Sequence, residues 1–133
     1  MYTKVFIDES ISKDTMDETC TIYRTVEFIS KKWTLLVLLE LYKSKGTRRY
    51  SELKQSLLDI TPKILSSRLR ELEHQGLITK KITTDTFPIK CEYTLTESGT
   101  EFIRIIKEIK KWSLRWKYQN NECAQQDCRF CEL

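Results

Sequence analysis

The sequence has few of the residues that interrupt a chain or build small catalytic sites. Of its 133 residues, three are glycine, two are proline and one, His74, is histidine. The shortage of glycine argues against Gly-rich phosphate loops, and no GxGxxG, GxxxxGK[ST], HExxH or GxSxG motif occurs. A single histidine also removes most catalytic and metal sites that depend on imidazole. We therefore expect a protein that is not an enzyme.

Long apolar runs are absent as well. No stretch approaches the roughly 18 residues that a membrane span needs. The first ten residues lack the apolar segment and small-residue cleavage site of a secretory leader. Hydrophobic residues make up 40% and charged residues 32% of the chain, which is a globular balance. These features predict a soluble cytoplasmic protein with no membrane partner.

The excess of positive charge is small. Lysine and arginine number 23 against 19 acidic residues, so the formal net charge is +4. A difference of this size does not by itself indicate binding to nucleic acid. Whether the chain binds nucleic acid has to be judged from the placement of the basic residues along the predicted elements.

Apolar residues at helical spacing predict four helices before residue 76. They cover residues 17–30, residues 33–43, a short segment capped by Ser51 that contains Leu53, Leu57 and Leu58, and residues 62–75. Thr61-Pro62 marks the start of the fourth, because threonine caps the first turn and proline needs no hydrogen bond there. Gly76 ends this helix, since glycine adopts a left-handed conformation easily.

A β-hairpin and a long helix follow. The predicted strands are residues 77–84 and 90–95, with a tip at 85–88. Thr96 or Ser98 caps the last helix, whose apolar face consists of Phe102, Ile103, Ile105, Ile106, Ile109, Trp112 and Trp116. This face is wider than a small core needs, which favours a homodimer interface shared with helix 17–30 over plain core.

The order of these elements is typical of a winged helix-turn-helix. We predict a mainly α fold with a small β-hairpin wing (α+β) and long dimerisation helices at both ends. Residues 1–16, where Tyr2, Val5 and Ile7 partly alternate with polar residues, form an N-terminal arm. Residues 17–117 form the domain, and residues 118–133 form a tail that contains cysteines.

Helix 62–75 has the two faces of a recognition helix. Ile64, Leu65, Leu69 and Leu72 share one side, and Lys63, Ser66, Ser67, Arg70 and His74 share the other. Basic and hydroxyl side chains suit phosphates and base edges in the major groove. Any surface helix can carry a polar face, but further basic residues flank this one: Arg48, Arg49, Lys80, Lys81 and Lys90. The arrangement predicts binding to double-stranded DNA.

The stretch from Cys20 to Trp112 resembles the HxlR-type group of winged-helix regulators, which is related to the MarR-like proteins. The residues that carry the resemblance are Cys20 thirteen positions before Trp33, Lys32-Trp33-Thr34-Leu35-Leu36, Arg49-Tyr50-Ser51-Glu52-Leu53, Ile60-Thr61-Pro62-Lys63, Leu65, Arg68-Leu69-Arg70-Glu71-Leu72-Glu73, Gly76-Leu77-Ile78, Pro88, Tyr93-Thr94-Leu95-Thr96, Gly99 and Trp112. Ser30 and Lys31 stand where the group often has glycine, and Cys91 replaces a usual valine.

The resemblance implies a homodimer joined through the first and last helices and bound to a two-fold symmetric operator. It places Lys63, Ser66, Ser67 and Arg70 in the groove and the hairpin as the wing. It also implies that Cys20, near the start of the first helix, senses oxidants or electrophiles. A small core residue is the alternative for Cys20, and Cys91 is most simply a buried, valine-like residue.

The tail contains Cys123, Cys128 and Cys131 in a C-x4-C-x2-C pattern. Three thiolates are one ligand short of a tetrahedral zinc site, and Cys20 of the partner subunit is a candidate for the fourth. A disulfide between Cys20 and a tail cysteine of the other subunit is a second interpretation. A tail without a function is the third.

We therefore expect a DNA-binding transcription regulator, a repressor, that binds a palindromic operator as a homodimer and senses a redox or metal signal through cysteine. The alternative is a winged-helix module that binds protein, or a metal-binding accessory factor. A thiol oxidoreductase that uses Cys128 and Cys131 is disfavoured, because the pair does not follow a strand in an α/β pattern.

Overall fold

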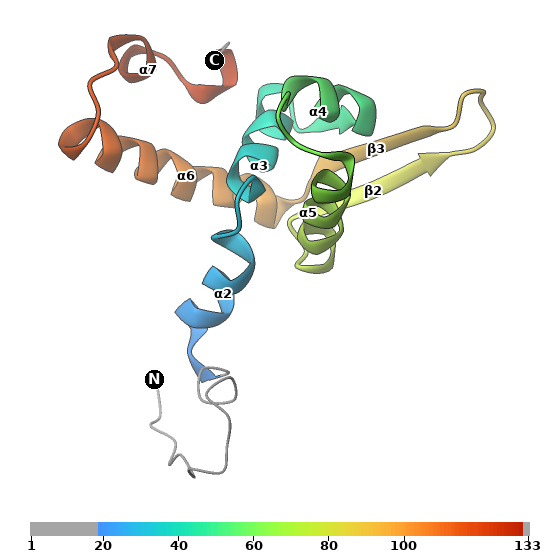
Figure 1. The fold of residues 1–133 in the computed structure, drawn as a ribbon, viewed down its shortest axis with the longest axis horizontal. Coiled ribbons are helices and arrows are strands. Elements are labelled where there is room, and N and C mark those ends of the chain that lie inside the picture. Colours follow the sequence, from blue (N-terminus) through green and yellow to red (C-terminus); the bar gives the residue numbers. More distant parts are fainter. Residues whose placement is uncertain (1–18, 132–133) are drawn as a thin grey trace. The chain divides into compact units, whose positions relative to one another are not determined.

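The computed structural model describes residues 19–131 (Figure 1). The chain divides into two units, Met1–Lys32 and Trp33–Leu133, and each is described by itself. In the first unit the described part holds helix α2 (Thr21–Ile29), with Cys20 as its N-cap. This helix lies within the predicted range 17–30. The predicted arm, residues 1–16, lies outside the described residues.

The second unit holds a three-stranded sheet among helices. Its elements in chain order are α3 (Thr34–Lys43), β1 (Thr47–Arg49), α4 (Tyr50–Ser56), α5 (Pro62–His74), β2 (Ile78–Thr83), β3 (Lys90–Leu95), α6 (Glu97–Trp116), α7 (Asn121–Gln125) and the 3-10 helix η2 (Cys128–Phe130). The sheet is antiparallel with the strand order β1-β3-β2. Figure 1 shows β2 and β3 extending together as a hairpin.

Helix α3 lies at the centre of this unit and packs against α4, α5, α6, the sheet and η2. Its residues Val37, Leu38 and Leu41 are fully buried. Leucine and isoleucine side chains from the surrounding elements complete the core: Leu53, Ile60, Leu65, Leu69, Leu72, Leu77, Ile78, Ile103 and Ile106. The hydrophobic effect of burying these side chains fixes α5 and the hairpin on one scaffold.

Three local signals in the sequence are confirmed. Thr61 caps α5, and its Oγ1 accepts a hydrogen bond from the Ile64 N–H at 3.2 Å. Gly76 follows α5 with a φ of +84°, the left-handed conformation expected at a helix end. Thr96, rather than Ser98, caps α6 by accepting a hydrogen bond from the Gly99 N–H at 3.1 Å.

Two predictions about the region before α5 were wrong. Ser51 does not cap α4. The helix begins at Tyr50, and the N–H of its N-cap residue Arg49 donates to Oε1 of Glu52 at 2.9 Å. The helix ends at Ser56, and Leu58 beyond it is 82% exposed. Strand β1 was not predicted, because three residues of sequence Thr-Arg-Arg show no alternation of apolar and polar residues.

The predicted tail contains two short helices. These are α7 and η2, and η2 packs against α3. In residues 19–131 we find no helix that is long and apolar enough to cross a membrane.

Candidate nucleic-acid interface

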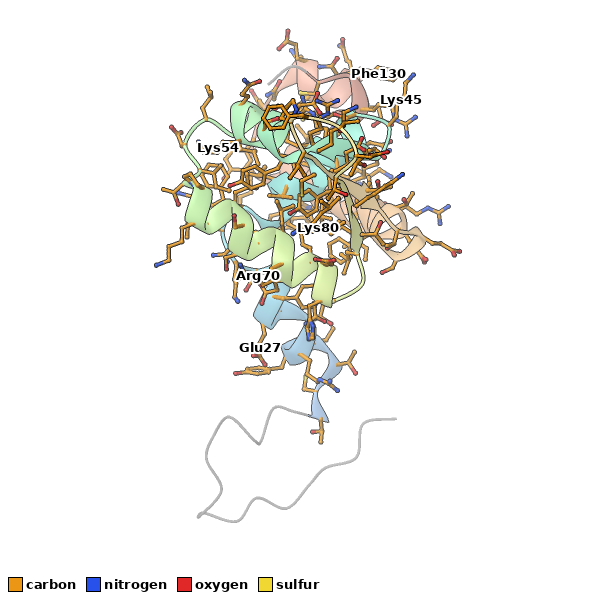
Figure 2. The ribbon with its side chains drawn as sticks, turned by 90° about the vertical axis from the view of Figure 1, so that its right-hand side faces the viewer. Glu27, Lys45, Lys54, Arg70, Lys80 and Phe130 are labelled. Carbon is orange, nitrogen blue, oxygen red and sulfur yellow. The ribbon has the colours of Figure 1, made fainter. Side chains whose placement is uncertain are left out.

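Helix α5 separates apolar and basic side chains as the sequence predicts. Leu65, Leu69 and Leu72 are fully buried against the core. On the other side, Lys63 and Arg70 are exposed, and Ser66 and Ser67 are half-buried between them. Figure 2 shows the Arg70 side chain on the outer side of α5. The four residues predicted to enter the DNA groove therefore share one accessible face.

Tyr50 fixes the start of α5 against α4. Its hydroxyl donates a hydrogen bond to the carbonyl oxygen of Pro62 at 3.3 Å and lies 3.4 Å from Oγ of Ser66. Sequence reasoning gave no role to Tyr50, because the contact joins residues that are far apart in the chain. The bond orients the N-terminal turn of α5, where backbone N–H groups attract phosphate.

The two arginines before α4 face opposite ways, because successive side chains on a strand alternate. The Arg48 side chain is partly buried, and its Nη1 donates to Oε1 of Glu40 at 3.1 Å and to Oγ of Ser56 at 2.7 Å. Arg49 is exposed. Arg48 thus ties α3 to α4. The DNA contacts predicted for Arg48 and for Arg49 stay predictions.

The hairpin formed by β2 and β3 carries three lysines, of which Lys80 and Lys81 are exposed and Lys90 is half-buried. Figure 2 labels Lys80. Lys80 and Lys81 point to opposite faces of the sheet. In the strand register, Lys81 and Arg49 both lie directly opposite Glu92. One face of the sheet therefore carries two basic residues and one acidic residue. At the tip, Phe87 is 99% exposed.

A cleft of about 630 Å³ separates the start of α4 from this hairpin. Its lining includes Arg49, Tyr50, Phe87, Lys90 and Cys91. Basic residues, Arg49 and Lys90, therefore line both walls of this cleft. Helix α5 has an accessible basic face, α4 contacts it through Tyr50, and the β2–β3 hairpin carries further basic residues. This is the DNA-binding arrangement of a winged helix-turn-helix.

The comparison with known families agrees with this geometry. Residues 28–121 match the family described as HxlR-like helix-turn-helix. The chain belongs to this family. HxlR-like proteins are helix-turn-helix transcription regulators, so the chain is a transcription regulator that binds DNA, and it is not an enzyme.

Relatives of this HxlR-like protein support the assignment. The HTH-type regulator YvaP of Bacillus subtilis is 34% identical over 93 residues, which cover 70% of this chain and 83% of YvaP. A solved structure from Porphyromonas gingivalis W83, classed with the MarR family of transcriptional regulators, has a TM-score of 0.65 at 33% identity and covers 80% of this chain and 97% of its own. The predicted fold is thereby confirmed.

A further solved structure that this chain is similar to is that of a redox regulator. The redox regulator HypR in its oxidised form is 29% identical, with a TM-score of 0.61, and covers 74% of this chain and 99% of its own. In the HxlR-like chain, Cys20 is half-buried at the start of α2, and its Sγ accepts a hydrogen bond from the Tyr23 N–H at 3.3 Å. The predicted position of this thiol at a helix start is confirmed.

Cys91 differs from the buried, valine-like residue expected. It is half-buried and shares a face of β3 with Tyr93, two residues along the same strand. Burial, and secondly the neighbouring Cys91 side chain, raise the pKa of Tyr93 well above its usual range. Tyr93 therefore stays protonated and neutral inside the sheet.

The apolar residues of α6 divide into two stripes, where the sequence predicted one broad face. Ile103 and Ile106 are buried in the core. The second stripe remains accessible in the single chain, with Ile105 49%, Ile109 46%, Trp112 56% and Trp116 68% exposed. Helix α2 also presents Ile22 and Val26, which are 71% and 45% exposed.

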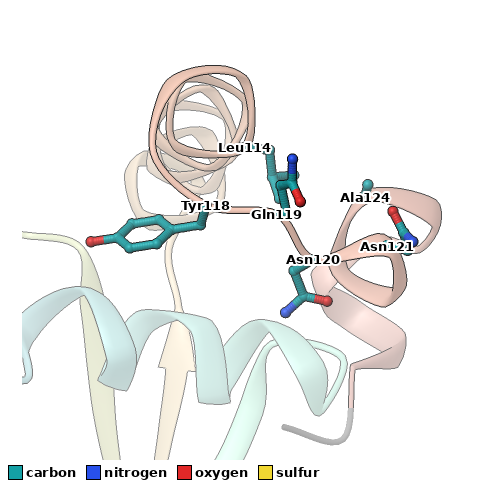
Figure 3. Close-up of a pocket in the computed structure, with 6 residues that line it drawn as sticks. All are labelled: Leu114, Tyr118, Gln119, Asn120, Asn121 and Ala124. Carbon is teal, nitrogen blue, oxygen red and sulfur yellow. The ribbon is translucent and has the colours of Figure 1, made fainter.

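The three tail cysteines do not form a metal site within one chain. Across residues 19–131, no three cysteine, histidine, aspartate or glutamate side chains gather closely enough to hold a metal ion. A hollow of about 510 Å³ lies where α6 leads into α7, and Figure 3 shows its lining of Leu114, Tyr118, Gln119, Asn120, Asn121 and Ala124. This lining contains no cysteine. The zinc site completed by a partner's Cys20 stays a prediction.

Proposed function

We propose that this HxlR-like regulator represses transcription by binding a two-fold symmetric operator as a homodimer. In this proposal Lys63, Ser66, Ser67 and Arg70 of α5 enter the major groove. Arg49 and the hairpin lysines Lys80, Lys81 and Lys90 neutralise phosphates on either side. The accessible basic face of α5, opposite a fully buried leucine face, is the observation that carries the proposal.

The second stripe of α6 supports the homodimer. Four large apolar side chains at helical spacing, each about half exposed or more, form a patch that a monomeric protein rarely leaves in water. A second copy of the chain is the partner that a two-fold operator requires. Helix α2, in the other unit, has exposed apolar side chains of its own, Ile22 and Val26.

Cys20 is the sensing thiol in this proposal. Its sulfur already serves as a hydrogen-bond acceptor at the first turn of α2, so a covalent change at the sulfur alters the start of a dimerisation helix. Movement of that helix changes the spacing of the two α5 helices on DNA. The likeness to a redox regulator, HypR, supports this part of the proposal.

DNA binding is tested with the purified chain and a fluorescent duplex from the region upstream of its own gene. Anisotropy is recorded in dithiothreitol over a salt series, beside a shuffled duplex of equal composition. We expect binding to the upstream duplex to be at least about 10³-fold tighter, with log K falling linearly as log salt rises. Equal affinity for both duplexes in every condition would favour the protein-interaction alternative.

The sensing part of the proposal has a separate test on the same duplex. Wild type and Cys20→Ser are compared after diamide treatment and, in parallel, after chelation with EDTA. The proposal predicts that diamide changes the affinity of wild type much more than that of Cys20→Ser. An equal response of both proteins would move sensing away from Cys20, and a response to EDTA alone would favour the zinc interpretation.

A further inference from the structure

Asp127 in the C-terminal segment ties this segment to two helices of the domain. Its Oδ2 accepts a hydrogen bond from Nζ of Lys107 on α6 at 2.9 Å and from the hydroxyl of Tyr42 on α3 at 3.3 Å. Its Oδ1 accepts one from the Arg129 N–H at 2.9 Å. The Arg129 N–H, followed by the Lys107 ammonium, lowers the pKa of Asp127 to about 2. The carboxylate is therefore ionised at neutral pH.

The ring of Tyr42 lies at the centre of these contacts. Lys107 Nζ is 4.7 Å and Arg129 Cζ is 4.6 Å from the ring centroid, which is cation–π distance. Lys107 Nζ also lies 2.7 Å from the Tyr42 hydroxyl, and Lys110 Nζ donates to the carbonyl oxygen of Gln126 at 2.8 Å. We call Tyr42, Lys107, Asp127 and Arg129 the Asp127 clasp. It makes the segment part of the α3–α6 surface.

The residue next to Asp127 begins a turn with a cysteine at each end. Cys128 starts η2, and the N–H of Cys131 donates to the carbonyl oxygen of Cys128 at 3.2 Å. Residues i and i+3 of such a turn have Cα atoms less than about 7 Å apart, and disulfides span Cα separations of about 4.4–6.8 Å. Side chains at i and i+3 of a 3-10 turn also stack on one side.

Small reagents have access to this turn. A cavity of about 550 Å³ lies between the segment and the α3–α4 region, and Cys131 is part of its lining together with Arg48 and Ser56. Both cysteines are half-buried. The turn therefore brings the backbones of two cysteines within the range that a disulfide spans, directly after the carboxylate that docks the segment, and Cys131 lies beside an open cavity.

We propose that Cys128 and Cys131 form a reversible intrachain disulfide that holds the Asp127 clasp closed. The oxidant is a small-molecule disulfide such as glutathione disulfide. One cysteine thiolate attacks a sulfur of the reagent and releases one glutathione thiolate. The second cysteine then attacks the mixed disulfide and releases the other glutathione. The two cysteines lose two protons and two electrons, and the reagent becomes two thiols.

A disulfide that holds the Asp127 clasp closed also restrains the region before the recognition helix. Arg48, which lines the same cavity, ties Glu40 of α3 to Ser56 of α4. A segment locked over this cavity restrains the α3–α4 corner that precedes the recognition helix. This inference does not depend on DNA binding or on the dimer.

The test uses the full chain with Cys20, Cys91 and Cys123 replaced by serine, so that only the pair remains. The protein is equilibrated with dithiothreitol or glutathione disulfide, alkylated, and measured by intact mass and by amide hydrogen exchange. We expect a single, uncrosslinked chain that is lighter by two hydrogens and carries no glutathione and no alkyl group. Amides of residues 120–131 should exchange about tenfold more slowly than in the reduced form.

Two matched proteins sharpen the result. Adding Cys128→Ser to the triple variant should trap a persistent mixed disulfide with glutathione at Cys131. Peptide mapping of the wild-type chain should find the same Cys128–Cys131 bridge, so the test stands even if the triple variant folds poorly. A bridge between two chains, a mixed disulfide that never resolves with both cysteines present, or faster exchange of the segment after oxidation would each overturn the proposal.

Discussion

Replacing Gly99 by alanine tests how closely α6 packs on the end of the hairpin. Gly99 is buried in the first turn of α6, and a Cβ there would collide with the carbonyl oxygen of Leu77. It would also lie 3.1 Å from Cδ2 of Leu95. The Leu77 carbonyl accepts a hydrogen bond from the Thr96 N–H at 3.0 Å, so the backbone cannot move aside without losing that bond.

Two opposing effects set the magnitude. Alanine is a better helix former than glycine by at most about 1 kcal/mol. Overpacking a tight site costs about 1–3 kcal/mol, and a collision with backbone belongs at the upper end of this range. We therefore expect Gly99→Ala to lower the free energy of unfolding by about 2 kcal/mol and the Tm by roughly 8 °C.

Urea denaturation followed by circular dichroism measures this difference. Ser98→Ala is the matched control, because Ser98 is the exposed neighbour in the same turn and its change should stay within about 0.5 kcal/mol. A Gly99→Ala protein as stable as wild type, or more stable, would refute the close packing of α6 against Leu77.

Three further predictions concern the core, the clasp and the dimer. Leu69→Ala should lower the free energy of unfolding by about 2–5 kcal/mol, because this leucine is fully buried; urea curves measure it, and a loss below 1 kcal/mol would contradict the burial of α5. The pKa of Asp127 is about 2 in the folded chain and near 3.8 when unfolded, so its stabilising effect is complete above pH 4 and is lost as the pH falls from about 4 to about 2. The side chain is 37% exposed, so we reduce the expected contribution to about 1 kcal/mol; unfolding curves of wild type should converge on those of Asp127→Asn in this range, and curves that stay parallel would argue against the clasp. Trp112→Ser should weaken the dimer in sedimentation without unfolding the chain, since Trp112 is 56% exposed in the single chain; an unchanged dimer would place the interface elsewhere.

Local signals in the sequence predicted much of the fold. Thr61-Pro62, Gly76 and Thr96 act on their immediate neighbours, so the ends of helices α5 and α6 could be placed from short stretches of sequence. The spacing of Leu65 and Leu69 likewise predicted which side of α5 is buried. These features depend on helix geometry alone.

Features that depend on distant contacts were missed. Asp127 contacts Lys107 and Tyr42, which are 20 and 85 positions away. No periodic pattern in the sequence predicts such a contact. The same holds for β1, a strand of three residues that is defined by its pairing with β3. The hydrogen bonds of Arg48 to α3 and α4 were missed for the same reason, because they join segments that the sequence alone does not place together.

The apolar face of α6 shows what helical spacing alone does not predict. Helical spacing grouped Ile105 and Ile106 on one broad face, but the structure buries Ile106 and exposes about half of Ile105. A sequence reveals that a helix is apolar over a wide arc. Only the position of α3 decides which part of the arc belongs to the core and which part remains for a partner.

The central claim is that α5 reads DNA through its exposed basic face. The most direct measurement compares the salt dependence of upstream-duplex binding for wild type, Lys63→Ala/Arg70→Ala and the control Lys111→Ala, whose side chain on α6 is 74% exposed. The account predicts that the control binds like wild type. The double variant should lose preference for the upstream duplex and reduce the salt slope by about one for each phosphate contact removed. Equal binding by all three proteins would contradict the assignment of α5 as the recognition helix.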